Sequence, residues 1–314
     1  MKKRLPYLLL TITTVIWGLA FVAQKIAATL PAFTVGALRS ILAVLFIFAV
    51  IPIFDRLTKN GRSFFSKKTI LDFNKRELVG GLVLGILLTV ATTLQQTGIG
   101  EGDSGKAAFI TALYVVLVPI YALAVKKKAP LNVWLSVIIA VIGFYYLCIT
   151  DNFTMEGCDV FVLISSMIFP LHILVIDHFS PKCDGIRLSM VQFVFCALTN
   201  LVLALIFERG SDISLVFDAI LPLLYLGIAS SGIAYTLQIV GQKGVNPAAA
   251  SILMSLESVF GVLGAMLLLR EVMSTREYIG CAVVFVAVIL SQIDFVSMIK
   301  NKRKYKENNN GKEA

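Results

Sequence analysis

A few polar and ionisable side chains lie inside stretches of sequence that are otherwise apolar. The most isolated is Glu257 in the segment SILMSLESVF, because no other charged residue occurs between Pro247 and Leu269. Ionisable groups inside a bilayer are costly and usually serve a function. Glu257 could bind a ligand's ammonium group or a proton, since burial favours the neutral form of a carboxyl. A structural hydrogen bond to a neighbouring helix is the alternative.

Two cations also fall within apolar stretches. Lys25 lies near the end of the first one, where it could extend to the membrane interface or face an internal cavity. Arg39 lies inside the second one. It could contact an anionic group of a ligand, pair with a carboxylate, or tie the first two helices together.

Further candidate ligand contacts are amides, hydroxyls, aromatic rings and one imidazole. They are Trp17, Gln95, Thr111, Tyr114, His172, Tyr235 and Gln238. His172 is one of only two histidines, and its ordinary titration range makes it a candidate proton relay; a hydrogen-bonded core histidine is the alternative. Hydrogen bonds between helices would account equally well for the glutamines, and packing for the aromatic rings.

The composition places these residues in a membrane protein. Of the 314 residues 58% are hydrophobic and 15% charged, whereas soluble domains carry roughly 25% charged residues. The net charge of +9 comes from basic residues gathered between apolar runs, which is typical of membrane topology. We therefore expect no nucleic-acid partner. The five cysteines lack metal-ligand spacing, so we expect no metal or other cofactor.

The apolar runs predict an all-α integral membrane protein, since a bilayer crossing needs about 20 apolar residues. Ten spans are predicted: 5–28, 32–53, 78–99, 104–125, 131–149, 158–178, 187–207, 218–240, 247–269 and 275–297. Most lysines and arginines fall on the cytoplasmic side if both termini lie there, in the cell membrane. That side includes the basic loop 54–77 and a basic tail, 301–314, which we expect to be disordered.

The chain also contains an internal repeat. Residues 93–116, TLQQTGIGEGDSGKAAFITALYVV, align without gaps to residues 236–259, TLQIVGQKGVNPAAASILMSLESV, at an offset of 143. Asp103 and Asn246 then match as expected N-caps of the next helix. The repeat predicts two five-helix halves, about 1–150 and 151–300. Because five is odd, the halves enter the membrane from opposite sides, an arrangement that surrounds a central cavity in secondary transporters.

The repeat pairs the candidate residues with one another. Glu257 matches Tyr114, and Gln238 matches Gln95. Each pair lies at equivalent depth in the two halves. An in-plane pseudo-twofold axis would bring the members of each pair to the same cavity.

Four motifs resemble those of one known family. They are WGLAFVAQK from Trp17 to Lys25, Leu38-Arg39, GKAAFITALYVVLVP at 105–119 and LESVFGVLGAMLLLRE at 256–271. In this order the chain resembles the EamA-type permeases of the drug/metabolite transporter superfamily. The resemblance implies that helices 1–4 and 6–9 surround the cavity and that helices 5 and 10 are peripheral. One departure is the stretch 126–128, three lysines where the family often has an acidic residue.

The expected function is secondary-active transport of a small metabolite, an amino acid, a related compound or a xenobiotic, by an exporter or exchanger. No GxxxxGK[ST] motif is present, so a gradient of substrate or protons would drive transport. A channel or receptor is the alternative, although nothing resembles a selectivity filter. A membrane-embedded enzyme is less favoured, because HExxH and GxSxG motifs are absent. Association into a homodimer is left open.

Overall fold

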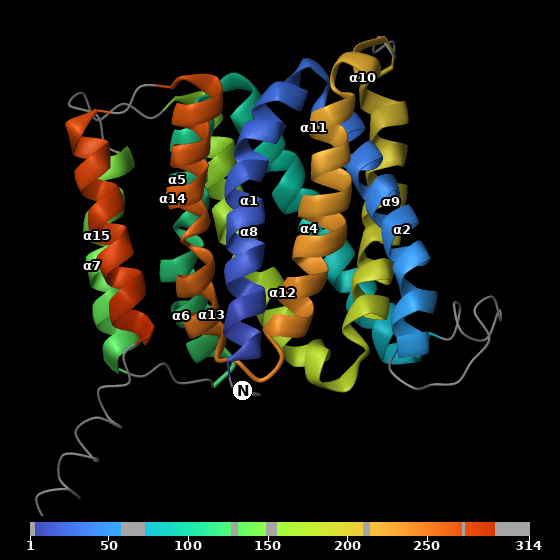
Figure 1. Ribbon diagram of the computed structural model, residues 1–314, viewed down its shortest axis with the longest axis horizontal. Helices are drawn as coiled ribbons and strands as arrows, with labels where there is room; N and C mark the ends of the chain where they lie inside the picture. Colours follow the sequence, from blue (N-terminus) through green and yellow to red (C-terminus); the bar gives the residue numbers. More distant parts are fainter. Residues whose placement is uncertain are drawn as a thin grey trace, which may run out of the picture.

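The computed structural model describes residues 4–57, 73–126, 131–148, 156–209, 214–271 and 274–292. The predicted basic tail, 301–314, and the middle of the predicted basic loop, 54–77, lie outside these residues. The described elements form a bundle of helices that run roughly parallel to one another (Figure 1).

The first half of the chain contains seven described elements. They are α1 (Leu5–Ile26), the 3₁₀ turn η1 (Ala27–Thr29), α2 (Ala32–Leu57), α4 (Lys75–Glu101), α5 (Ser104–Ala112), α6 (Tyr114–Ala124) and α7 (Leu131–Cys148). Local sequence explains the start of α4, where the Asn74 side chain accepts from the Glu77 amide and the Glu77 side chain from the Asn74 amide. Such a capping box satisfies two of the amides that a helix N-terminus leaves free.

The second half is interrupted more often. It consists of α8 (Gly157–Phe179), η2 (Ser180–Lys182), α9 (Gly185–Phe207), α10 (Ser214–Asp218), α11 (Ile220–Leu224), η3 (Tyr225–Ala234), α12 (Tyr235–Gly241), α13 (Pro247–Met254), α14 (Glu257–Gly264), η4 (Ala265–Leu269) and α15 (Thr275–Gln292). Both η3 and η4 are π-helical, a wide conformation that often occurs at functional sites.

Among the residues that the structure describes, eight helical segments are long and apolar enough to cross a bilayer. They correspond to eight of the ten predicted spans. The remaining two, 131–149 and 275–297, correspond to α7 and α15, whose apolar stretches Trp134–Gly143 and Tyr278–Ala287 are shorter. Large apolar side chains such as Leu45, Leu205 and Leu267 are exposed on the outside of the bundle. This arrangement is that of a multi-pass membrane protein, because such a surface is stable only against lipid.

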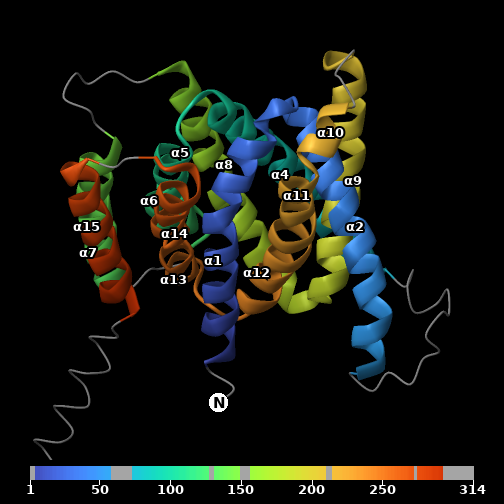
Figure 2. The ribbon, with the colours of Figure 1, turned by 45° about the horizontal axis from the view of Figure 1, so that its top comes forward.

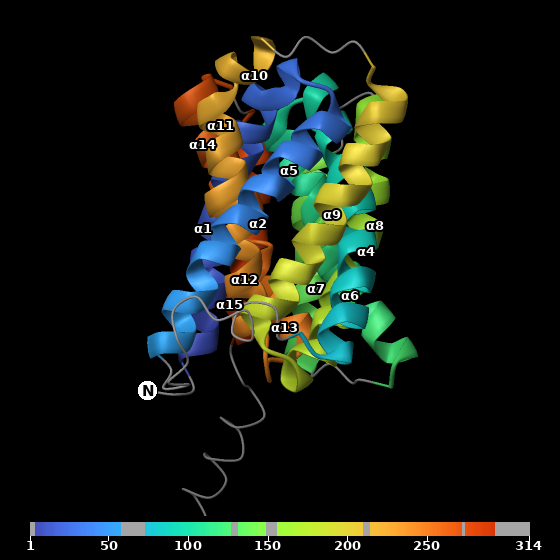
Figure 3. The same cartoon turned by 90° about the vertical axis from the view of Figure 1, so that its right-hand side faces the viewer.

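The helices divide into a central group and a peripheral pair. Helices α7 and α15 pack on each other at one edge of the bundle (Figures 1 and 2). In the central group, α4 packs against α8 and α9, and α2 packs against α9 (Figure 3). Helix α1 lies in the middle of this group and contacts η3, α12, α13 and α14.

Two predicted spans are broken at equivalent positions. Helices α5 and α6 meet at Leu113, and α13 and α14 meet just before Glu257. The Leu113 amide bonds to Ile110 O at 3.2 Å and the Leu256 amide to Leu253 O at 3.3 Å. Both are tight 3₁₀-type bonds. The two breaks lie 143 residues apart, at the offset of the sequence repeat.

The predicted N-caps also lie at equivalent positions. Asn246 precedes α13, and its side chain accepts from the Ala248 amide at 3.0 Å. Asp103 precedes α5 in the same extended conformation, without a side-chain capping bond. Both residues therefore lie where the sequence predicts, and only Asn246 bonds the helix end.

Candidate functional site

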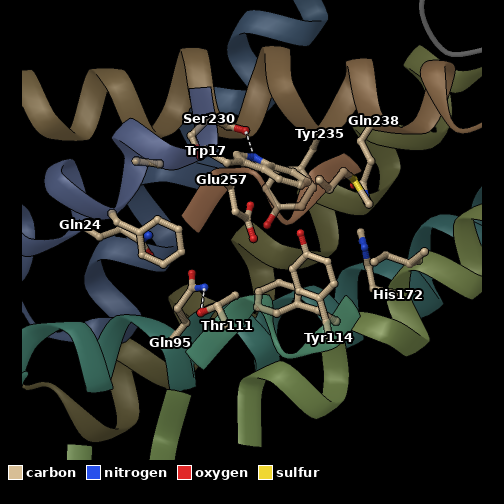
Figure 4. A pocket seen from close by; sticks show the side chains of 15 residues that line it. Trp17, Gln24, Gln95, Thr111, Tyr114, His172, Ser230, Tyr235, Gln238 and Glu257 are labelled. Atoms are coloured by element: carbon tan, nitrogen blue, oxygen red, sulfur yellow. Dashed lines mark hydrogen bonds between the residues drawn. The ribbon is translucent and has the colours of Figure 1, made fainter. Parts of the chain in front are cut away.

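A cavity lies inside the central group of helices, beside both helix breaks (Figure 4). About 40 Å³ of it is open to the centres of water molecules. Since one water needs about 10–15 Å³ by this measure, the space is narrow. The residues that line it are Trp17, Ala20, Phe21, Gln24, Gln95, Thr111, Tyr114, Phe169, His172, Ile173, Ser230, Tyr235, Gln238, Met254 and Glu257.

Eight of the ten residues singled out in the sequence line this cavity. They are Trp17, Gln95, Thr111, Tyr114, His172, Tyr235, Gln238 and Glu257. The other two, Lys25 and Arg39, lie elsewhere. A role for any of the ten in binding a ligand stays a prediction.

Glu257 is the first residue of α14, and its repeat partner Tyr114 is the first residue of α6. Glu257 is 4% exposed. The Tyr114 hydroxyl is directed toward the carboxyl group (Figure 4), yet it has no well-oriented hydrogen-bond partner among the described residues. The ion pairs of the described residues do not include Glu257. The cavity therefore presents a carboxyl group without a compensating cation.

A glycine on α1 positions Glu257. At Gly18, an added Cβ would lie 2.3 Å from Phe260 Cβ and 2.9 Å from Glu257 O. Only a residue without a side chain permits this approach of α1 to α14. The contact holds the start of α14 directly against α1, beside Trp17.

The aromatic side of the cavity is held by specific contacts. Trp17 Nε1 donates to Ser230 O at 3.3 Å, and the rings of Trp17 and Tyr235 have centroids 4.6 Å apart. His172 meets Tyr235 edge-on, with centroids 5.9 Å apart. Its Nε2 lies 2.9 Å from Gln192 Oε1. One ring nitrogen of His172 is therefore engaged outside the cavity lining, and proton relay by this residue stays a prediction.

The two paired glutamines have different environments. Gln95 Nε2 donates to Thr111 Oγ1 at 3.0 Å. At the offset of 143, the residue equivalent to Thr111 is Met254, whose thioether is only a weak acceptor. Gln238 Oε1 is buried without a hydrogen-bond partner among the described residues. The Gln95 amide is thus hydrogen-bonded within the cavity, whereas the Gln238 side-chain oxygen has no partner among the described residues.

Arg39 lies behind the cavity wall. Its Nε donates to Ser231 Oγ at 3.0 Å and its Nη2 to Ser230 Oγ at 3.1 Å. It therefore ties α2 to η3. The tie considered from the sequence alone was between the first two helices.

Lys25 bonds the last turn of α4. Its Nζ donates to Gly100 O at 3.1 Å and to Gly102 O at 2.8 Å. Carbonyls at a helix C-terminus favour a cation. This contact accounts for Lys25 without a ligand.

Seven lining residues were not among the candidates singled out in the sequence: Ala20, Phe21, Gln24, Phe169, Ile173, Ser230 and Met254. Gln24 lies seven residues after Trp17, which is the same helix face, so periodicity could have found it. Ser230 lies five residues before Tyr235, a spacing that shares a face only in a π-helix. We find no sequence signal that distinguishes Phe169 from the other apolar residues of α8.

Charged contacts surround one end of the bundle. Glu271, just after η4, accepts from Ser104 Oγ at 2.8 Å and from the Gly105 amide at 3.3 Å. Lys106 and Asp159 form an ion pair at 2.6 Å. These contacts hold the start of α5 to the end of the broken helix α13–α14 and to α8. In the part of the chain that the structure describes, no three His, Cys, Asp or Glu side chains could hold a metal ion.

The fold and the cavity define a class: a multi-pass helical membrane protein with a buried polar site between its helices. A profile described as the EamA-like transporter family matches residues 4–149 and 157–292. The chain therefore belongs to the EamA-like transporter family, and the resemblance seen in the sequence motifs is confirmed. The family indicates a membrane transporter rather than an enzyme.

Individual relatives agree with the family. An uncharacterized transporter of Archaeoglobus fulgidus is 26% identical over 286 residues, covering 90% of this chain and 83% of that protein. An uncharacterized transporter of Methanothermobacter thermautotrophicus is 22% identical over 306 residues, covering 92% and 87%. A solved crystal structure is similar in fold, with a TM-score of 0.69, 15% identity and coverage of 91% of this chain and 96% of that one.

Proposed function

We propose that the protein is a secondary-active transporter of a small metabolite that works by alternating access, as an exporter or exchanger. Its ten spans form two inverted five-helix halves, 1–150 and 151–300, which rock against each other around the cavity. The breaks at Leu113 and Leu256, 143 residues apart, support this arrangement. The two segments matched by the family profile support it as well.

The observation that carries the proposal is the buried carboxyl group of Glu257. It is 4% exposed, it faces a cavity lined by both halves, and it makes no ion pair with a described residue. A buried carboxylate without a neighbouring cation is costly. Its retention is understandable if the group binds a substrate amine or a proton during the transport cycle.

The proposed orientation places both termini in the cytoplasm, with the protein in the cell membrane. Glu101, Lys106, Asp159 and Glu271 then lie at the outer end of the bundle, and Asn74 and Lys243 at the inner end. Substrate or protons moving down a gradient would supply the energy.

Purified protein in proteoliposomes tests this function. Uptake of labelled small metabolites, amino acids and amines among them, is measured with and without a pH gradient. We expect saturable uptake of at least one solute and counterflow when the same solute is preloaded. A single-channel conductance, or flux that does not saturate, would contradict transport by alternating access and favour the channel alternative.

A further inference from the structure

We propose that the cavity selects a small organic cation, a primary amine without a carboxylate, rather than a zwitterionic amino acid or an anion. This inference rests on the proposed transport function and narrows its substrate class. It is based on the charge of the lining, the aromatic wall, and the places where the nearest cations are bound.

The charge of the lining favours a cation. Among the described lining residues, Glu257 is the only acidic side chain, and no lysine or arginine is present. The side-chain oxygens of Gln238 and Gln24 are buried there without partners among the described residues, and the Tyr114 hydroxyl points toward the Glu257 carboxyl group (Figure 4). An ammonium group has three N–H donors and no acceptor. It would neutralise Glu257 and could satisfy a neighbouring oxygen.

The wall of the cavity is also suited to a cation with an apolar body. Five aromatic rings line the space, including Trp17, Tyr114 and Tyr235. Ring faces attract ammonium groups, and the attraction is stronger where water is excluded. The same ring faces offer an apolar surface to a short alkyl chain, whereas their negative charge density disfavours a carboxylate.

Arg39 and Lys25 are bound to other groups, so they provide no site for a ligand's carboxylate. Arg39 lies behind Ser230 and donates to the hydroxyls of Ser230 and Ser231. Lys25 is bound to the carbonyls of Gly100 and Gly102. A bound amino acid would place its carboxylate in the cavity without a lysine or arginine to meet it, and a buried unpaired charge is strongly disfavoured.

Four solutes with one alkyl skeleton test the inference: 3-methylbutylamine, 3-methylbutanol, 4-methylpentanoate and leucine. The amine and leucine differ only by the carboxylate. In a Trp134→Phe background, Trp17 is the one remaining tryptophan of the two, so its fluorescence reports occupancy of the cavity. Thermal stabilisation of the purified protein gives a second readout, because at equal concentration a ligand that binds more tightly raises the melting temperature more.

We expect the amine to bind at least about tenfold more tightly than the other three, since hydrogen bonds between ionised groups are the strong ones. Glu257→Gln should remove this preference, and Glu257→Asp should retain part of it. Glu101→Gln is the matched control, because Glu101 is exposed at the end of α4. Tighter binding of leucine or 4-methylpentanoate would overturn the inference, as would the absence of amine binding in both readouts.

Flux measurements separate this inference from the proposed function. If the amine binds in a Glu257-dependent manner but no solute is transported in proteoliposomes, the cation site stands and the transport proposal fails. If leucine binds more tightly and is transported, transport stands and the cation inference fails.

Discussion

At the scale of the residue, Arg39 distinguishes a structural cation from one that binds ligand. Its guanidinium group reaches two hydroxyls, those of Ser230 and Ser231, from a buried position. Ser230 in turn lines the cavity and accepts the Trp17 N–H through its carbonyl. Arg39 therefore supports the cavity wall from outside.

Arg39→Lys should destabilise the protein without a selective loss of ligand affinity. Lysine keeps the charge but lacks the planar fork that reaches two acceptors at once. Loss of a hydrogen bond to a charged group costs about 1.5–3 kcal/mol, so the melting temperature in detergent should fall by several degrees. A variant with unchanged melting temperature and weaker ligand binding would instead place Arg39 in the binding site.

The sequence repeat brought together four residues that lie around one cavity. Glu257, Tyr114, Gln95 and Gln238 were paired by one register, and all four line the cavity. Arg39 could not be placed in this way, because its serine partners lie 191 and 192 residues further along the chain. No local pattern reveals such a contact.

At the scale of the element, the close contact of α1 with α14 sets the position of the site. Gly18→Ala would bring Cβ within 2.3 Å of Phe260 Cβ, so the two helices must separate. Because Glu257 begins α14, we expect substrate affinity and flux to fall with this single methyl group. Gly157→Ala is the matched control, since nothing lies within 4 Å of an added Cβ there. Equal flux in the two variants would show that this contact does not position the site.

The start of α5 depends on Glu271 from the other half of the chain. Glu271→Ala removes the acceptor of Ser104 Oγ and of the Gly105 amide. Loss of a helix cap costs about 0.5–2 kcal/mol. Backbone amides around Ser104–Ala107 should therefore exchange hydrogen for deuterium faster. The same substitution at the exposed Glu101 should not change exchange there, and unchanged exchange in Glu271→Ala would contradict the contact.

The helix breaks were not predicted. Spans 104–125 and 247–269 were expected to be continuous, and each is divided, after residues 112 and 254 respectively. No glycine or proline lies within three residues of Leu113 or Leu256, and these are the usual causes of sharp kinks. At the second break the hydroxyls of Ser255 and Ser258 donate to Ile252 O and Ser255 O, and such local bonds often bend helices. Hydrophobic periodicity does not reveal these bonds.

At the scale of the whole molecule, hydrophobicity predicted the positions of eight membrane segments well, because helices are the only open-chain structures that satisfy their backbone in lipid. The apolar stretches of α7 and α15 are shorter than those of the other eight segments. The peripheral place of this pair, which the family resemblance implied, agrees with its packing at one edge of the bundle.

Topology can be tested by labelling at the two ends of α4. In a chain whose five cysteines are replaced, Glu101→Cys should react with an impermeant maleimide from outside intact cells. Lys75→Cys should react only after the cells are opened. Both positions are exposed. The reverse pattern would invert the proposed orientation, and labelling of both from outside would contradict a membrane-spanning α4.

The central claim is that Glu257 acts on the transported solute, and Glu257→Gln tests it most directly. Glutamine keeps the size of the side chain, but it carries no charge and has no titratable proton. The initial rate of uptake in proteoliposomes should fall by at least about tenfold, since a lost charged contact of about 1.5–3 kcal/mol corresponds to a factor of that order. The melting temperature and elution volume of the variant should match those of the wild type. Unchanged uptake, with an unchanged dependence on the pH gradient, would reduce Glu257 to a structural residue and contradict the account.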